Sequence, residues 1–250
     1  MTEGVQSVSR AFGLLEAIAD AGGELTLTDL AEASGLPMPT IHRLLQTLVA
    51  GGYVRQQASR RYALGARLIR LGRQADRQVG VLAQPELRRL VVELGETANL
   101  AVLEGDTAVY LAQSPSAHSM RMFTEVGRRV AVHNTGVGKA MLAGLDDAAV
   151  LSLLHRTGME QRTPRSHATP EALLADLAEI RARGYAIDDE EQELGVRCYA
   201  MAVPDAELPV ALSVSGPVSR VDEAFAARAI PALREATTRV SAELAASNGG

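Results

Sequence analysis

Residues 25–53, LTLTDLAEASGLPMPTIHRLLQTLVAGGY, have the pattern of two short helices joined by a tight turn. Thr26 followed three residues later by Asp29 is a capping-box signature, so the first helix is expected to begin there and to end at Gly35. In the second helix, apolar residues follow the spacing of a single face, at Ile41, Leu44, Leu45, Leu48 and Val49. That face is expected to pack inward against the first helix.

The opposite face of the second helix is small or polar, which suits a helix lying in the major groove of DNA. An arginine there can bond guanine bidentately and a glutamine can bond adenine. Pro37 and Pro39 fit the first helical turn, where a missing N–H costs no hydrogen bond. The candidate base-reading residues are Thr40, His42, Arg43, Gln46 and Thr47. The same pattern also fits an ordinary helical hairpin inside another α-helical domain.

A predicted β-hairpin and a local excess of arginine follow this pair of helices. Residues 53–56 and 61–64 alternate in character around Gln57-Ala58-Ser59-Arg60, which completes a winged helix-turn-helix. Residues 36–73 contain seven arginines and no acidic residue, although the whole chain has a net charge of -5. This asymmetry favours contact with DNA phosphates, with Arg60 and Arg61 on the wing, over an ordinary solvated surface.

Composition limits the class of protein. The chain has 250 residues and is 47% hydrophobic, but only 3% aromatic with no tryptophan, so stacking on single-stranded nucleic acid is not expected and duplex DNA is the better partner. Cys198 is the only cysteine, which indicates a reducing, cytoplasmic compartment. No apolar run approaches the roughly 20 residues of a membrane span, and the first ten residues lack the apolar core of a signal peptide. We therefore expect no membrane partner.

The pattern predicts two domains of unequal size. An amphipathic helix carrying Val8, Phe12, Leu15, Ile18 and Ala19 is expected to close the core of a DNA-binding domain over residues 1–65. Residues 66–80 are read as a linker helix, and residues 81–250 as an effector-binding and oligomerisation domain. Pro85 is expected to interrupt the helical pattern, and a new helix that carries Leu87, Leu90, Val91 and Leu94 is expected to follow it.

The second domain has the pattern of an antiparallel α+β fold. A hairpin is expected at residues 99–113 around Glu104-Gly105-Asp106, and a third strand at residues 119–123. The helix that begins at Thr169-Pro170 is expected to end at Gly184. Further helices are expected at residues 138–143, 146–154 and 220–246, and further strands at residues 197–203 and 210–215.

A glycine-rich turn, Thr135-Gly136-Val137-Gly138-Lys139, opens a helix in this domain and offers N–H groups to an anion such as a carboxylate. The spacing is not that of a phosphate-binding P-loop, so nucleotide hydrolysis is unsupported and no cofactor is expected. Lys139, the only lysine, is either a partly exposed helix residue or a direct ligand contact. The acidic residues at 188–193 fit a solvated loop.

Taken together, six segments resemble the IclR family of bacterial transcription regulators over essentially the whole chain. They are SVSRAFGLLEAI, the helix-turn-helix, YALGARLIRLG, HNTGVGKAMLA, GYAIDDEEQELGVRCYAMAVPD and ALSVSGPVSR. The resemblance implies a winged helix joined to an effector domain with a GAF-like sheet, assembled as a homodimer or tetramer. It also implies a small carboxylate or aromatic acid as effector. Met38 and Pro39 depart from the Ser and Lys common there, so base preferences at that point do not carry over.

The resemblance also implies the residues that bind the effector. Family members that bind small oxoacids hold the ligand with a glycine turn, an aspartate, a cysteine and two serines, which correspond here to Gly136 and Val137, Asp188, Cys198, and Ser213 and Ser215. The apolar wall of the family's pocket corresponds to Met122, Val130 and Val196. Amides and hydroxyls can donate to a carboxylate in a dry site. Alternatively, Cys198 is an inert buried thiol and the two serines line a core strand.

The sequence therefore predicts a transcription factor, by family habit a repressor, that binds a pseudo-palindromic site on double-stranded DNA and responds to a small organic acid. One alternative is an enzyme on small oxoacids with Cys198 as nucleophile and His133 as base. Another is a ligand-binding module whose winged helix makes only protein contacts. A metal held by His133, Cys198 and Asp188 lacks close ligand spacing, so no metal is expected.

Overall fold

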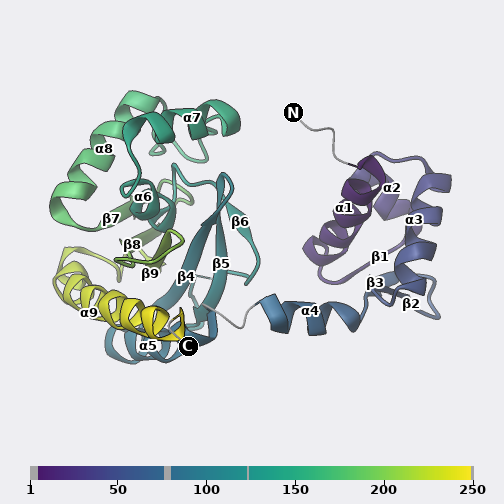
Figure 1. The fold of residues 1–250 in the computed structure, drawn as a ribbon, viewed down its shortest axis with the longest axis horizontal. Helices are drawn as coiled ribbons and strands as arrows, with labels where there is room; N and C mark the ends of the chain where they lie inside the picture. Colours follow the sequence, from purple (N-terminus) through teal and green to yellow (C-terminus); the bar gives the residue numbers. More distant parts are fainter. Residues whose placement is uncertain (1–4, 76–79, 123, 249–250) are drawn as a thin grey trace. The chain divides into compact units, whose positions relative to one another are not determined.

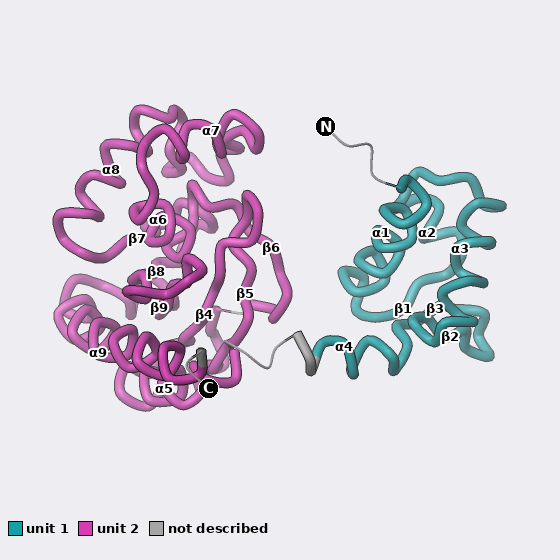
Figure 2. The backbone as a smooth tube through the Cα atoms, in the orientation of Figure 1, with its two compact units in different colours: residues 1–75 teal, residues 76–250 magenta. Residues whose placement is uncertain are grey.

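The computed structural model describes residues 5–75, 80–122 and 124–248. The chain forms two compact units, residues 1–75 and residues 76–250, which are coloured separately in Figure 2. Each unit has its own hydrophobic core and is described by itself. Within the described ranges, no helix has both the length and the apolar character needed to cross a membrane.

The first unit is a winged helix-turn-helix (Figure 1). Its helices are α1 (Gln6–Asp20), α2 (Leu27–Ser34), α3 (Met38–Ala50) and α4 (Arg67–Ala75), and its strands are β1 (Glu24–Leu25), β2 (Val54–Gln56) and β3 (Tyr62–Leu64). The strands form an antiparallel sheet in the order β1-β3-β2, so the predicted hairpin gains a third strand from the segment ahead of α2.

Local interactions explain why α2 and α3 begin and end where they do. Thr26 and Asp29 form both bonds of the capping box, with the Asp29 amide donating to Thr26 Oγ1 at 3.2 Å. Gly35 ends α2 in the left-handed conformation at φ 64°. Pro39 lies in the first turn of α3 as expected, whereas Pro37 occupies the N-cap position just before the helix and makes no side-chain cap bond. The helix-turn-helix is therefore determined by signals within a few residues.

The apolar face of α1 differs from the prediction. Leu14, Leu15 and Ile18 are buried, whereas Val8 is 50% and Phe12 61% exposed. Within this unit only the second half of α1 reaches the core formed with α2, α3 and the sheet. On α3, Ile41 and Leu45 are buried, Leu44 and Leu48 pack at the margin of the core, and Val49 is exposed.

The second unit is built on a six-stranded antiparallel sheet in the order β6-β5-β4-β9-β8-β7. Its strands are β4 (Thr97–Glu104), β5 (Thr107–Ser114), β6 (Arg129–Val130), β7 (Ala186–Asp189), β8 (Val196–Ala202) and β9 (Val210–Pro217). Its helices are α5 (Gly80–Leu94), α6 (Gly136–Leu142), α7 (Asp147–Thr157), α8 (Pro170–Arg183) and α9 (Glu223–Asn248).

Helices cover both faces of this sheet (Figure 1). On one face α5 and α9 form an apolar core with residues such as Leu100 and Leu212. On the other face α6, α7 and α8 form a second core with residues such as Ala101 and Ala211. Successive side chains of β4 and β9 therefore enter different cores, which explains why both strands are buried nearly throughout. The predicted α+β class is confirmed.

Three features of the second unit differ from the prediction. Pro85 lies inside α5 and does not interrupt it, because burial of Leu87, Leu90 and Leu94 on the sheet outweighs one missing helical bond. Residues 119–122 form no strand, and Phe123 lies outside the described residues. The carbonyls of Met120 and Met122 instead accept bonds from the side chains of Arg220 and Thr97. The strand that pairs with the outer side of β5, at this edge of the sheet, is β6.

The third difference is β7, which the sequence pattern read as part of an acidic loop. In the structure, Ala186 and Asp188 are buried, whereas Ile187 and Asp189 are half-buried. The strand pairs with β8 along its whole length. Because two of its four residues are aspartates, the alternation of buried and half-buried side chains was not recognised as a strand pattern.

Candidate functional site

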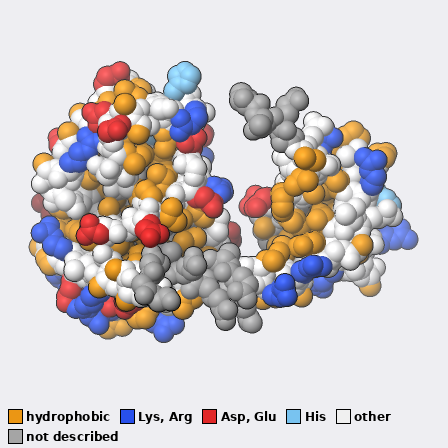
Figure 3. All heavy atoms as spheres, viewed as in Figure 1, with side chains coloured by type: hydrophobic (Ala, Val, Ile, Leu, Met, Phe, Trp, Pro, Cys, Tyr) orange, Lys and Arg blue, Asp and Glu red, His pale blue; other side chains and the backbone are white. Residues whose placement is uncertain are grey.

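The candidate DNA-reading surface is the outer face of α3. Burial of Ile41 and Leu45 turns the polar side chains of the opposite face away from the core. His42, Arg43, Gln46 and Thr47 are exposed and Thr40 is half-buried. The Thr47 hydroxyl donates to the Arg43 carbonyl at 3.1 Å, which limits its rotation. In Figure 3, Lys and Arg side chains of this unit are seen along α4 and, separately, at the outer edge near α3.

The two arginines of the wing differ in setting. Arg60 is exposed at the tip of the wing and has a left-handed backbone conformation with φ 63°. Its backbone amide donates a hydrogen bond to the Gln57 carbonyl at 2.9 Å, which stabilises this turn. The Nε atom of Arg61 lies 3.1 Å from Glu24 Oε1 of β1, and both side chains are partly exposed. Arg60 is therefore the better placed of the two to meet a phosphate, whereas Arg61 also links the strands of the wing.

The glycine-rich turn lies directly against β8 in the second unit. The Thr135 hydroxyl caps α6 by accepting the Gly138 amide at 3.3 Å. A Cβ atom at Gly136 would lie 2.9 Å from Cys198 Sγ and 3.3 Å from Ala200 Cβ. Glycine at position 136 is therefore what allows the start of α6 to approach the strand so closely.

The sheet register brings the polar residues of the predicted pocket together. Asp188 pairs with Cys198, and Cys198 pairs with Ser215, so these three side chains form one row across β7, β8 and β9. Ser213 lies two residues along β9 on the same face. All four residues are buried, and the Ser213 hydroxyl, which lies near the Cys198 thiol, makes no hydrogen bond of standard geometry among the described residues. A buried hydroxyl without a partner is uncommon and indicates a place for a polar ligand or water.

Two groups in this row have perturbed acidities. Burial raises the pKa of Asp188 to about 7, and the negative charge of Glu191 adds to the effect. Asp188 Oδ1 accepts the amides of Glu191 and Gln192 at 2.8 and 3.3 Å. Burial likewise raises the pKa of Cys198 to about 12, with the Asp188 charge as the second cause. At neutral pH the cysteine is therefore a thiol, and a large share of Asp188 is protonated.

The three residues expected to form the apolar wall are all half-buried, but they fall into two places. Met122 and Val196 line a surface cavity of about 470 Å³, together with Met120, Leu194 and Pro217. Val130 of β6 instead packs against the apolar cluster under α6. Val137 belongs to that cluster as well, and both Gly136 and Val137 are buried.

Models of two families match the chain. "IclR helix-turn-helix domain" matches residues 7–58, and "Bacterial transcriptional regulator IclR C-terminal" matches residues 75–242. The chain belongs to the IclR family. As a member of that family it is a DNA-binding transcriptional regulator.

Named relatives and solved structures agree with this assignment. The chain is 41% identical to the "Transcriptional repressor IclR" of Escherichia coli K12 over 244 residues, covering 93% of this chain and 89% of that protein. An IclR regulator from Alicyclobacillus acidocaldarius matches with a TM-score of 0.84 at 30% identity, covering 96% of this chain and 99% of that one. An IclR homolog from Microbacterium hydrocarbonoxydans, complexed with 4-hydroxybenzoate, matches in fold with a TM-score of 0.81 at 23% identity, covering 96% and 100%.

Two predictions about charged residues of this IclR-family chain were wrong. Lys139 is neither partly exposed nor directed to a ligand, because its buried ammonium group bonds Asp176 and Glu191. The acidic stretch is not simply a solvated loop, since Asp188 and Glu191 are buried. A charged residue at the start of a helix packed on a sheet must find partners, and here they come from α8 and the loop after β7.

Sequence reasoning also missed two residues near the pocket of the IclR-family chain. Tyr110 of β5 is buried, and burial together with the charges of Cys198 and Asp188 raises its pKa. Asn134, two residues before Gly136, is fully buried, and its amide group has no hydrogen-bond partner among the described residues. Asn134 could have been found from the sequence, because it lies inside the segment HNTGVGK. Tyr110 could not, because only the order of the strands in the sheet brings it near Cys198 and Asp188.

The enzyme and metal alternatives both need His133 beside Cys198, but the contacts of these two residues differ. His133 is buried, and its Nε2 atom lies 3.0 Å from the Glu160 carbonyl oxygen. Cys198 faces the Gly136 turn, and its raised pKa disfavours the thiolate that a nucleophile requires. The geometry therefore gives no support to a Cys198–His133 pair.

Proposed function

We propose that this regulator binds a small organic acid in the pocket between the Gly136 turn and strands β7, β8 and β9, and that the acid changes how two winged helices are spaced on a pseudo-palindromic operator. The observation that carries the proposal is the buried Ser213 hydroxyl without a partner, in the same face as Asp188, Cys198 and Ser215. A repressor acting as a homodimer or tetramer in the cytoplasm is the form that we propose.

The chemistry of the pocket favours a carboxylate. The hydroxyls of Ser213 and Ser215 can donate to it, and Asp188 can do so when protonated, which its raised pKa allows near neutral pH. The apolar cluster around Val137 excludes water and strengthens these bonds. The 4-hydroxybenzoate in the Microbacterium relative is an acid of this class. The proposal takes small oxoacids and aromatic acids as the candidate effectors.

On the DNA side, we propose that α3 enters the major groove. Arg43 and Gln46 read base edges, Thr40, His42 and Thr47 flank them, and Arg60 and Arg61 of the wing contact phosphates. The exposed outer face of α3 and the seven arginines at residues 36–73 support this assignment.

The pocket is tested by thermal unfolding of the purified protein with glyoxylate, pyruvate and 4-hydroxybenzoate. An acid at 100 times its dissociation constant should stabilise the parent by roughly 2.7 kcal/mol. Replacing Ser213 and Ser215 together by alanine should abolish this shift, whereas Ser219→Ala, at an exposed serine, should leave it unchanged. An equal response of the double variant would show that the acid binds elsewhere.

The DNA surface is tested by fluorescence anisotropy with operator and unrelated duplexes at several salt concentrations. Arg43→Ala should cost about 1–3 kcal/mol on the operator and relax base preference, and Arg60→Ala should weaken both duplexes and lower the salt slope by about 1. Arg162→Ala, an exposed arginine of the second unit, is the control. If Arg43→Ala and Arg60→Ala both bind like the parent, the winged helix serves other contacts.

A further inference from the structure

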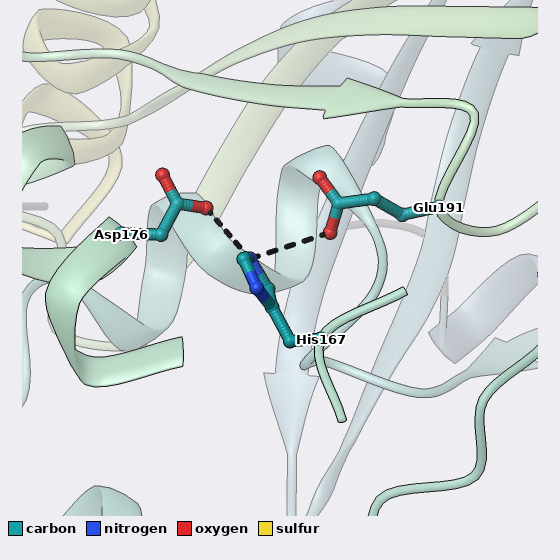
Figure 4. A group of neighbouring side chains, drawn as sticks. All are labelled: His167, Asp176 and Glu191. Carbon is teal, nitrogen blue, oxygen red and sulfur yellow. Dashed lines mark hydrogen bonds and ion pairs between the residues drawn. The ribbon is translucent and has the colours of Figure 1, made fainter. Parts of the chain in front are cut away.

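A second group of chemically active side chains lies beside the pocket and takes no part in the proposed effector binding. Figure 4 shows His167, Asp176 and Glu191 directed toward one another. The Nε2 atom of His167 lies 3.1 Å from Asp176 Oδ2 and 3.7 Å from Glu191 Oε2. The three residues come from the segment before α8, from α8 and from the loop after β7, so only the tertiary fold brings them together.

One oxygen of this group is buried and without a hydrogen bond. Glu191 is 6% exposed, and among the described residues its Oε2 atom has no hydrogen-bond partner, although it faces His167. Its other oxygen, Oε1, accepts a bond from the Lys139 ammonium group, which also donates to Asp176 Oδ2 at 2.7 Å. Lys139 therefore holds both carboxylates in place and leaves Oε2 facing the imidazole.

The surroundings are accessible and negatively charged. A surface cavity of about 530 Å³ opens against the group, so water can reach it. Five carboxylates and three cations line this cavity, a balance of minus two with neutral histidine, and within it Lys139 and Arg183 pair with the carboxylates of Asp176 and Glu191. The charged lining residues are Asp176, Glu179, Asp189, Glu191, Glu223, Lys139, Arg183 and Arg197.

We propose that His167 Nε2, Asp176 Oδ2 and Glu191 Oε2 form a binding site for a divalent first-row transition metal, with zinc as the representative ion. The three atoms lie within 4.8 Å of one another, close enough for small adjustments to place them around one ion. One imidazole nitrogen and two carboxylate oxygens are a donor set that zinc accepts, whereas an imidazole ligand disfavours calcium and magnesium. Water from the cavity completes the coordination.

Such an ion would link α8, through Asp176, to the loop after β7, through Glu191. The Glu191 amide donates to Asp188 Oδ1, so a metal on the Glu191 side chain would also stiffen the loop beside the effector pocket. The site itself does not depend on the proposed effector or on DNA, and its test therefore uses neither.

The test is calorimetric titration of the chelator-treated, untagged full-length protein with zinc chloride, and with magnesium chloride for comparison. We expect saturable binding of one zinc ion per chain and no comparable binding of magnesium. Because even supporting residues of metal sites contribute 10–100-fold to affinity, His167→Gln and Glu191→Gln should each weaken zinc binding by about 100-fold or more. Substituting cobalt should give visible absorption bands in the parent that both variants lose.

Matched control variants separate ligation from general surface binding. His155→Gln and Glu193→Gln change an exposed histidine and an exposed glutamate, and should bind zinc as the parent does. Circular dichroism and thermal unfolding without metal show whether each variant is folded. Absence of saturable zinc binding to the parent, or unchanged binding in folded His167→Gln and Glu191→Gln, would overturn the proposal.

Discussion

At the scale of single residues, Asp188 shows how the fold creates a functional acid. An aspartate on a strand edge would ordinarily be ionised, with a pKa near 3.8, but burial and the neighbouring Glu191 charge raise the pKa to about 7. Two backbone amides bonded to Oδ1 limit this rise, since they favour the charged form. The result is a carboxyl group that exchanges its proton in the physiological range, in the same row as Cys198 and Ser215.

The raised pKa predicts a pH dependence of stability. Between about pH 4 and pH 7 the folded protein keeps the Asp188 proton that the unfolded chain has released, so the contribution of Asp188 to stability falls as the pH rises through this range. Asp188→Asn removes this cost, because asparagine can still accept both amide bonds without a charge. At pH 8 the variant should unfold at a higher temperature than the parent, by roughly 2–4 °C for each kcal/mol relieved.

Calorimetric scans at pH 5, 6, 7 and 8 would measure this. The exposed Asp205→Asn variant, whose left-handed backbone suits asparagine, should follow the parent. A parent-like pH profile for Asp188→Asn would show that the acidity of Asp188 is not perturbed.

At the scale of elements, α2 and α6 depend on different kinds of interaction. The start of α2 is determined by the reciprocal bonds of Thr26 and Asp29. The start of α6 is capped by the Thr135 hydroxyl, but it also depends on contact with β8, because every residue of this short helix is buried. The two helices should therefore respond to different substitutions.

Thr26→Ala removes the side-chain oxygen that accepts the Asp29 amide, and should destabilise the winged helix by about 1 kcal/mol. Thr26→Ser keeps the oxygen and should retain most of the stability. Chemical unfolding followed by circular dichroism compares the three proteins. If both variants lose the same amount of stability, the stabilising group is the threonine methyl group and not the capping hydroxyl.

Gly136→Ala places a methyl group 2.9 Å from Cys198 Sγ and should cost about 1–3 kcal/mol through overpacking. Adding Cys198→Ala removes the sulfur and should recover part of the loss, a coupling that a double-mutant cycle measures. If the two changes are simply additive, the close approach of α6 to β8 does not limit stability.

At the scale of the whole molecule, regulation requires that the two units influence each other's binding. If a carboxylate lowers DNA affinity by a given factor, DNA must lower carboxylate affinity by the same factor. Anisotropy titrations of DNA with and without the acid, and calorimetric titrations of the acid with and without operator, should therefore give equal ratios, expected between about 5-fold and 150-fold. A ratio of one in both would mean that the acid is bound but does not regulate.

The sequence by itself determined the parts whose signals lie within a few residues. The helix-turn-helix, its cap at Thr26, its stop at Gly35 and the helix Pro170–Arg183 that ends at Gly184 follow from periodicity and capping, and the structure has them as predicted. The predicted effector residues came from family resemblance, and the sheet register explains why four of them share a face.

Only the tertiary structure decided the contacts made across long stretches of chain. The partners of Lys139 are 37 and 52 residues away, and Asp188, Cys198 and Ser215 meet because β7, β8 and β9 are neighbours in the sheet. Burial also decided which acids lose their ordinary pKa and which apolar residues of α1 reach the core. Hydrogen bonds within a helix depend on neighbouring residues alone, whereas burial and charge partners depend on which distant segments pack together.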